Sequence, residues 1–284
     1  MSTPPRQPVE NPLGWLHAPC VMGIVNVTPD SFSDGGETVN AATARARIDA
    51  MAINGAAICD IGAESTRPGA ERVSVDEQLR RLRPLLHDLA VRPASVAISI
   101  DTTRAPVAMA ALDSGAAMVN DLSAGREDLD LLPLVAERGA AVCLMHMRGQ
   151  PRDMQAAPVY DDVVGEVEAF LADRLQAAVD AGIPASRVVL DPGIGFGKTL
   201  AHNLALLTAL PRLACLGRPL LVGVSRKSML GTITGRSVHE RLAASLAAGL
   251  YAATHGAAVL RVHDVAETHD ALVTWGALQE AGRT

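Results

Sequence analysis

Aromatic side chains, cysteine pairs and long apolar runs are all scarce in this chain of 284 residues. Phe, Trp and Tyr make up 2% of the sequence, which argues against a stacking surface for single-stranded nucleic acid. The four cysteines include no C-x-x-C pair, and three of them lie in or beside apolar runs where buried thiols are common, so we expect a reducing cytoplasm. The one stretch that resembles a membrane span, 242–260, is rich in Ala and Gly, and it predicts a packed helix and a strand instead.

An excess of positive charge is also absent. Lys and Arg number 25 against 31 Asp and Glu, a net charge of −6, so the chain offers no broad basic surface to nucleic acid or to an anionic membrane. Any phosphate chemistry therefore requires a local pocket. The Pro-rich start lacks a basic segment followed by an apolar one. It predicts a flexible tail over 1–14 without a secretory signal, followed by one domain over 15–284.

Eight short apolar runs are present, and each ends at or near a polar residue before a helical pattern begins. From the first end to the last they recur about every 34 residues, the length of a βα unit. Runs that are apolar throughout predict parallel strands buried on both faces. We therefore expect an α/β fold, a single (β/α)8 TIM barrel, with a doubly wound open sheet as the alternative. The runs are VMGIV, AICDI, VAISI, AMV, AVCLM, VVL, LLVGV and VLRV.

Two S-x-x-E motifs, at 74–77 and 237–240, predict helix starts, because hydroxyl and carboxylate can satisfy the first backbone N–H groups. After the first motif, leucines at three- and four-residue spacing predict a helix with one apolar face. Pro84 lies inside that pattern, where a proline kinks a helix. After the second motif we expect an Ala-rich helix over 238–254.

Polar residues follow seven of these runs at places that a barrel would bring together. The carboxyl ends of barrel strands meet on one face, so these side chains would surround a single opening. Taken alone, an Asp at a strand end is more often a turn or helix cap. As a group, buried carboxylates and amides favour a ligand rich in ring N–H and amino groups. The residues are Asn26, Asp60, Asp101, Asn120, Asp191, Ser225 and His263.

Basic residues gather near the same strand ends, which favours a phosphate or pyrophosphate site. Each of them taken alone is more often part of a surface ion pair. They are Arg67, Arg226, Lys227 and Arg261, together with His263. The nearby run PGIGFGKT at 192–199 is neither a P-loop nor a G-x-G-x-x-G motif. We expect its glycines to form a turn that brings backbone close to the ligand.

Eight longer motifs follow one another along 21–277. They are GIVNVTPDSFSDGG from Gly23, DIGAESTRPGA from Asp60, ISIDTT from Ile98, VNDLSA from Val119, MHMRGQPRDMQ from Met145, DPGIGFGKT from Asp191, GVSRKSMLG from Gly223 and LRVHDV from Leu260. In this order they resemble the dihydropteroate synthase family of folate biosynthesis. The resemblance implies a pterin-binding (β/α)8 barrel that joins 4-aminobenzoate to 7,8-dihydropterin-6-ylmethyl pyrophosphate. The products would be 7,8-dihydropteroate and pyrophosphate, formed with Mg²⁺ through a cationic pterin methylene.

The same resemblance implies roles for individual residues. The pterin would contact Asp101, Asn120, Met145, Asp191, Phe196 and Lys227. The pyrophosphate would contact Asn26, Arg67, Arg261 and His263, with Asn26 also the protein ligand of Mg²⁺. The 4-aminobenzoate would contact Phe32, Ser65, Thr66, Arg67, Pro68 and Ser228. Catalytic roles would fall to Asn26, Asp34, Arg67, Lys227, Arg261 and His263, while Asp60 would anchor the second loop.

The expected partners are these small-molecule substrates, without nucleic acid or membrane. Family resemblance further implies a homodimer, with the Ala-rich helix as a candidate contact, and competition between sulfonamides and 4-aminobenzoate. Two other classes of protein stay open. One is a pterin- or folate-binding barrel of a methyltransferase system; the other is a non-catalytic paralogue.

Overall fold

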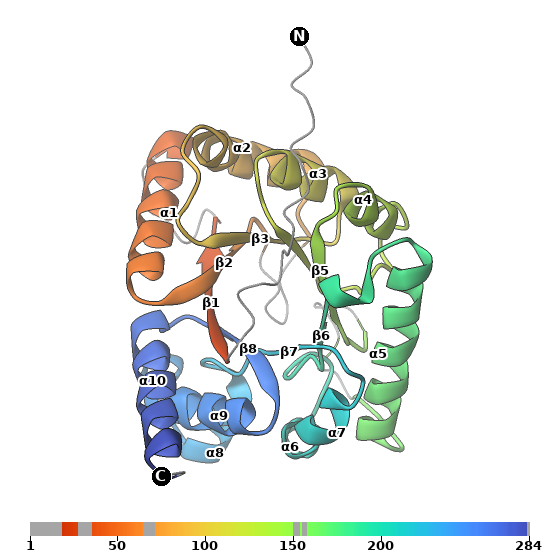
Figure 1. Ribbon diagram of the computed structural model, residues 1–284, viewed down its shortest axis with the longest axis vertical. Helices are drawn as coiled ribbons and strands as arrows, with labels where there is room; N and C mark the ends of the chain where they lie inside the picture. Colours follow the sequence, from red (N-terminus) through yellow and green to blue (C-terminus); the bar gives the residue numbers. More distant parts are fainter. Residues whose placement is uncertain (1–18, 28–35, 65–71, 150–153, 155–157, 283–284) are drawn as a thin grey trace.

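A computed structural model describes residues 19–27, 36–64, 72–149, 154 and 158–282. Eight parallel strands form a closed barrel in the order β1 to β8, and helices surround it (Figure 1). The predicted (β/α)8 barrel is therefore confirmed, and the open sheet is wrong. The strands are β1 (Cys20–Asn26), β2 (Ala56–Gly62), β3 (Ala97–Asp101), β4 (Met118–Asp121), β5 (Ala141–Met145), β6 (Val188–Asp191), β7 (Leu220–Val222) and β8 (Ala257–Val262).

Helices connect successive strands, as expected for right-handed crossovers between parallel strands. None of those in the described ranges is long and apolar enough to cross a membrane. They are α1 (Gly36–Ile53), α2 (Val75–Val91), α3 (Ala105–Asp113), α4 (Leu131–Glu137), α5 (Val163–Asp180), α6 (Leu200–Thr208), α7 (Leu210–Ala214), α8 (Ser228–Thr234), α9 (Leu242–Thr254) and α10 (Val265–Ala281), with short 3₁₀ turns η2 (Ala185–Arg187) and η3 (Val238–Glu240).

Both S-x-x-E motifs begin helical structure, but only one begins a long helix. The Ser74 hydroxyl accepts a hydrogen bond from the amide of Glu77 at the start of α2. This helix continues through Pro84 to Val91. The second motif forms a reciprocal capping box on the 3₁₀ turn η3, and the Ala-rich helix begins four residues later than expected, at Leu242.

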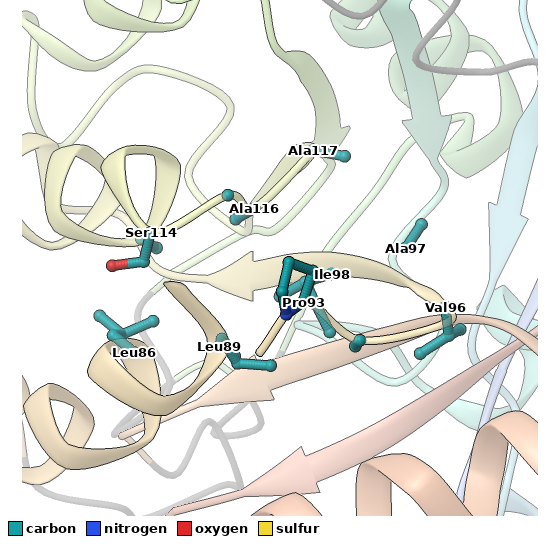
Figure 2. Close-up of a pocket in the computed structure, with 12 residues that line it drawn as sticks. Leu86, Leu89, Pro93, Val96, Ala97, Ile98, Ser114, Ala116 and Ala117 are labelled. Atoms are coloured by element: carbon teal, nitrogen blue, oxygen red, sulfur yellow. The ribbon is translucent and has the colours of Figure 1, made fainter. Parts of the chain in front are cut away.

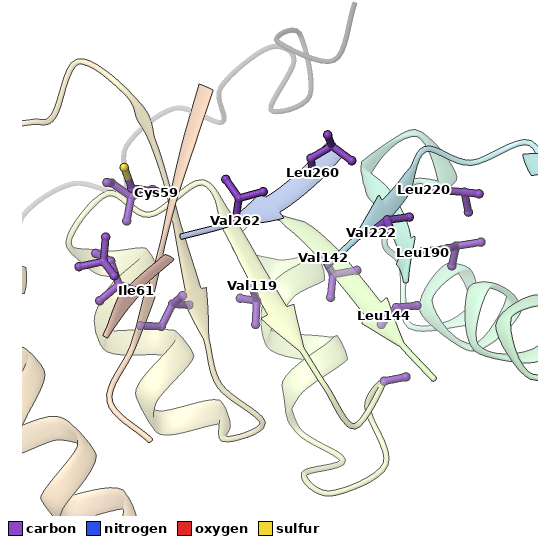
Figure 3. Close-up of a cluster of buried hydrophobic side chains, with 14 of the residues drawn as sticks. Cys59, Ile61, Val119, Val142, Leu144, Leu190, Leu220, Val222, Leu260 and Val262 are labelled. Atoms are coloured by element: carbon purple, nitrogen blue, oxygen red, sulfur yellow. The ribbon is translucent and has the colours of Figure 1, made fainter. Parts of the chain in front are cut away.

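The strand side chains alternate between two apolar layers. One set points outward against the helices, as Val119, Val142 and Leu190 do in Figure 3. The other set fills the barrel interior as a floor of buried side chains. The floor residues are Met22, Ile58, Met118, Ala141, Cys143, Val189, Leu221 and Val259.

A cavity of about 90 Å³ lies between α2, α3 and the start of β3 (Figure 2). Leu86 and Leu89 line one side of it, and Ile98 and Ala117 line another. Because Ala97 is the first residue of β3, this cavity lies toward the amino ends of the strands. It is therefore far from the polar strand ends and does not contribute to their chemistry.

Candidate active site

The strand pleat places the polar residues directly above the apolar floor. Asp60 lies two residues after Ile58 on β2, and Asn120 lies two residues after Met118 on β4. Asp191 follows Val189 in the same way on β6. Side chains two residues apart on a strand share a face. The predicted opening is thus a polar layer at the carboxyl ends, resting on the floor.

Arg261 links two of the inward carboxylates. Its Nε donates to Oδ2 of Asp60 at 2.7 Å, and its second terminal nitrogen donates to Oδ2 of Asp101 at 2.8 Å. Asp60 has no exposed surface. Burial raises the pKa of Asp101 to about 7, although the Arg261 charge opposes this shift. The structure therefore brings the basic group of β8 to the carboxylates of β2 and β3.

Asn120 completes this cluster and leaves acceptors facing the interior. Its Nδ2 donates to Oδ2 of Asp60 at 3.0 Å. In the part of the chain that the structure describes, Oδ1 of Asn120 and Oδ1 of Asp60 are buried without a hydrogen-bond partner. A buried acceptor without a donor is costly. These two oxygens therefore suit a ligand that brings N–H groups.

Asp191 and Lys227 form a second polar pair beside an apolar wall. Oδ1 of Asp191 accepts from the Gly193 amide at 2.7 Å. Burial raises the pKa of Asp191, and the Lys227 charge opposes the shift. Lys227 Nζ donates to the Ile194 carbonyl and lies 4.4 Å from the centre of the Phe196 ring.

The apolar wall is continuous with Phe196. Met145 is the register partner of Asp191 on the neighbouring strand. It belongs to a buried cluster that borders the polar layer, which gives a flat ring an apolar face beside its hydrogen-bonding groups. The cluster consists of Leu122, Met145, Met147 and Met154, with Phe196 packed against it.

Ser225 and His263 lie together beyond β7 and β8. The Ser225 hydroxyl is 3.0 Å from Nδ1 of His263 and accepts from the His263 amide at 3.2 Å. Strand β7 ends at Val222, so Ser225 lies in the following turn and not at the strand end as predicted. Ser228 is exposed at the first position of α8.

Arg226 does not join the predicted anion group. Its Nε donates to Oδ2 of Asp264 at 2.9 Å, and its φ angle is 57°, in the left-handed region. Its backbone amide also donates to the Ser245 hydroxyl at 2.9 Å. The contact with Asp264 directs the guanidinium toward the start of α10, so the expectation that Arg226 contributes a cation to the opening is wrong.

Asn26 is the candidate ligand for a hard cation. A methyl group added to Gly62 would lie 3.9 Å from Oδ1 of Asn26 and 3.7 Å from Oδ2 of Asp101. Both oxygens thus face the same side of the interior. Within the described ranges, no cluster of three or more His, Cys, Asp or Glu could hold a metal by itself. Oxygen donors in small number fit Mg²⁺, which is commonly completed by substrate phosphates and water.

Six predicted residues lie outside the described residues: Phe32, Asp34, Ser65, Thr66, Arg67 and Pro68. The described residues on either side of 65–71 are joined by a hydrogen bond. Oε1 of Glu64 accepts from the Val73 amide at 2.9 Å. Asp60 contacts Arg261 and Asn120; its expected role in anchoring the loop concerns residues that lie outside the described ones and stays a prediction.

Asp60 is among the residues predicted at the opening, but its contacts with Arg261 and Asn120 do not follow from its position in the sequence. One buried group, Lys198, is absent from the predicted site residues, because the run PGIGFGKT matches no phosphate-binding motif. Lys198 is 2% exposed, and burial lowers its pKa to about 7. Its neighbour His146 has a pKa of about 3, because burial and then the Lys198 charge lower it.

Comparison with known proteins first defines the class to which this protein belongs. Residues 22–263 match the family of pterin binding enzymes, in agreement with a barrel whose interior presents acceptors to an N–H-rich ring. The chain is 46% identical over 257 residues to dihydropteroate synthase of Escherichia coli (strain K12), with 90% of each chain covered.

Two solved structures narrow the class further. Xanthomonas albilineans dihydropteroate synthase with 4-aminobenzoic acid has a TM-score of 0.86 and 50% identity, over 93% of this chain and 94% of that one. The same enzyme in complex with 7,8-dihydropteroate has a TM-score of 0.83 and 48% identity, over 93% and 95%. The chain belongs to the dihydropteroate synthase family.

Proposed function

We propose that the chain catalyses the condensation of 7,8-dihydropterin-6-ylmethyl pyrophosphate with 4-aminobenzoate, which gives 7,8-dihydropteroate and pyrophosphate. The observation that carries this proposal is the position of Arg261. Its guanidinium contacts Asp60 and Asp101 in the polar layer, while its strand leads directly to His263. A site for an N–H-rich ring and a site for an anion are therefore adjacent.

The ring is bound by groups of opposite hydrogen-bonding type. Asp191 accepts from amino and ring N–H groups, and Asn120 offers its free Oδ1 in the same layer. Lys227 donates to ring acceptors, and its charge next to Asp191 supports the carboxylate form. Met145 and Phe196 cover the ring through apolar contact.

Substitution at the pterin methylene proceeds by departure of pyrophosphate and capture by the aryl amine. The C–O bond breaks and its electron pair leaves with the pyrophosphate; the amine nitrogen then forms the C–N bond and loses a proton. Arg261 contributes positive charge, and both Arg261 and His263 contribute N–H donors near the leaving group. No covalent enzyme intermediate is required, so no Ser or Cys nucleophile is assigned.

Magnesium is part of this proposal, with Asn26 as its protein ligand. When bound, the ion would neutralise charge on the pyrophosphate as it departs. Asn26 would orient that group toward Arg261 through its amide oxygen, which already faces the Asp101 side of the barrel. The proposed contacts of Arg67, Phe32, Ser65, Thr66, Pro68 and Ser228, and the role of Asp34 in orienting a loop or the cation, rest on the family resemblance.

The direct test is to incubate the purified protein with both substrates, with and without Mg²⁺, and to separate the products by chromatography. We expect 7,8-dihydropteroate and pyrophosphate in equal amounts. No dihydropteroate under either condition would contradict the proposal. Binding of the pterin without turnover would instead favour the methyltransferase-associated barrel or the non-catalytic paralogue, which the relatives do not favour.

A homodimer is proposed through the surface of α9 and α10. Tyr251 and Trp275 are each 38% exposed, and Leu278 is 63% exposed, on two helices that pack against each other. Large apolar side chains that stay exposed on two neighbouring helices favour a protein contact. Light scattering should give twice the chain mass.

The four unpaired cysteines support the proposed cytoplasmic location. Competition between sulfonamides and 4-aminobenzoate is proposed on the family resemblance. The tail predicted over 1–14 lies outside the described residues.

A further inference from the structure

Only two of the 25 basic residues are lysines, and both contact the same loop. Lys227 donates to the Ile194 carbonyl from the side of the pterin pocket. Lys198 donates to the carbonyls of Gly193 at 2.9 Å and Phe196 at 3.0 Å. The loop 192–197 is therefore held by an ammonium group on each of two sides.

The environment of Lys198 satisfies all its donors. Besides the two loop carbonyls, its Nζ lies 3.0 Å from Nδ1 of His146. An ammonium group has three N–H donors, and these are the three partners nearest to it. Lys198 is only 2% exposed to solvent. No surface function is open to it, and the mechanism above does not use it.

The glycines of this loop allow its close approach to the chain after β5. A Cβ atom on Gly193 would lie 1.9 Å from the carbonyl oxygen of His146, and one on Gly197 would lie 2.2 Å from that of Arg148. Both glycines have positive φ angles, 67° and 64°. On the outer side, the Tyr160 hydroxyl donates to the Gly197 carbonyl at 2.9 Å. The loop thus has little freedom except on the side of Lys227.

The two loop residues that Lys198 contacts, Gly193 and Phe196, are also parts of the pterin pocket or bind to it. The Gly193 amide donates to Asp191, and the Gly193 carbonyl accepts from Lys198. Phe196 contributes its ring to the apolar wall and its carbonyl to Lys198. We propose that Lys198 is a positioning residue for the pterin site, which holds Asp191 and Phe196 in place while Lys227 exchanges the Ile194 carbonyl for the substrate.

This inference rests on the proposed function, and it predicts different effects of a Lys198 substitution on the KM values of the two substrates. Lys198→Met removes the three donors but keeps an unbranched stem. We expect the KM for the dihydropterin pyrophosphate to rise about tenfold, equivalent to about 1.4 kcal/mol, while the KM for 4-aminobenzoate stays within about twofold. Arg218→Met is the matched control, because Arg218 donates to the Ala185 carbonyl at 2.8 Å on a remote part of the barrel.

A second variant and a spectroscopic measurement separate positioning from folding. Tyr160→Phe removes one outer contact of the same loop, and we expect a smaller rise, about two- to fivefold, in the same KM. In protein labelled with ¹³C-lysine, the two lysines give two sets of side-chain signals, which Lys198→Met assigns. Addition of 7,8-dihydropteroate should shift the Lys227 signal and leave that of Lys198 nearly unchanged.

Three results would overturn the inference. They are an equal rise of both KM values in Lys198→Met, an unchanged pterin KM in both variants, and a ligand-induced shift at Lys198 as large as that at Lys227. Calorimetric titration with 7,8-dihydropteroate keeps this test apart from the proposed function. If the wild-type protein binds the pterin but makes no product, the proposed function fails, and weaker binding by Lys198→Met still supports the positioning role.

Discussion

Nε of Arg261 and Oδ2 of Asp60 lie 2.7 Å apart, although 201 residues separate them along the chain. The carboxylate is completely buried, and the guanidinium is mostly so. A buried carboxylate without its cation would be strongly unfavourable. The pair therefore fixes the direction in which Arg261 points, and with it the second contact to Asp101.

Asp60→Asn should lower both stability and activity. The substitution keeps the shape but removes the charge that holds Arg261, and breaking a buried pair costs about 3–5 kcal/mol. Denaturant unfolding measures the first effect, and kcat/KM measures the second. Asp113→Asn is the control, because Asp113 pairs with Arg138 while its side chain is 56% exposed; such a pair contributes about 0–1 kcal/mol. Equal losses in the two variants would contradict the proposed importance of burial.

Asp191→Asn should weaken pterin binding specifically. The amide presents an N–H₂ group where the carboxylate accepted ring N–H groups, and an unmade buried hydrogen bond costs about 1–3 kcal/mol. We expect the Kd for a pterin ligand to rise by about five- to 150-fold. Calorimetry measures this change, and the melting temperature checks that the fold persists. A pterin affinity equal to that of the wild type would remove Asp191 from the site.

The pH dependence of kcat/KM should have two limbs. Burial lowers the pKa of Lys227 to about 8, with Asp191 opposing the shift, so the ammonium donor is lost as the pH rises above that value. Burial raises the pKa of Asp101 to about 7, so its carboxylate is lost as the pH falls below that value. A bell-shaped profile is expected. A flat profile from about pH 6 to pH 9 would contradict both assignments.

Removal of divalent cations should abolish most of the activity, and Mg²⁺ should restore it. Asn26→Asp keeps an oxygen ligand and should retain metal-dependent turnover. Asn26→Ala removes the ligand, so we expect it to require a higher Mg²⁺ concentration. Initial rates over a range of Mg²⁺ concentrations test this prediction. Full activity in excess chelator would show that the reaction needs no such ion.

The apolar floor should be essential for stability. Ile58 has no exposed surface, whereas Ile53 is 86% exposed at the end of α1. Ile58→Ala should lower the free energy of unfolding by about 2–5 kcal/mol, and Ile53→Ala by no more than about 0.5 kcal/mol. Denaturant unfolding compares the two directly. Similar values would mean that the floor is not tightly packed.

The barrel could be predicted from the sequence because its strands are short apolar runs with regular spacing. The same runs predict which residues face inward, since Asn120 and Asp191 continue the alternation that begins in the floor with Met118 and Val189. The end of β7 was placed too late because LLVGV remains apolar beyond Val222, where the chain has already left the ladder. The apolar pattern alone therefore does not show where the strand ends.

The partners of individual side chains were harder to predict from the sequence than the positions of the strands. Arg226 follows a strand just as Lys227 does, but a left-handed φ angle turns its backbone and Asp264 binds its side chain. Lys198 resembles an exposed residue at a helix start, yet three carbonyl and imidazole acceptors meet at its ammonium group. Both outcomes depend on contacts between segments that are distant in sequence, and local patterns contain no information about them.

Closure of the eight strands also limits how this protein can associate with others. A barrel of this kind has no edge strand, so no extended peptide or neighbouring sheet can extend it by backbone pairing. Recognition between copies has to occur through helix side chains, whose substitution can change assembly without disturbing the sheet. Aggregation by strand addition first requires the barrel to open.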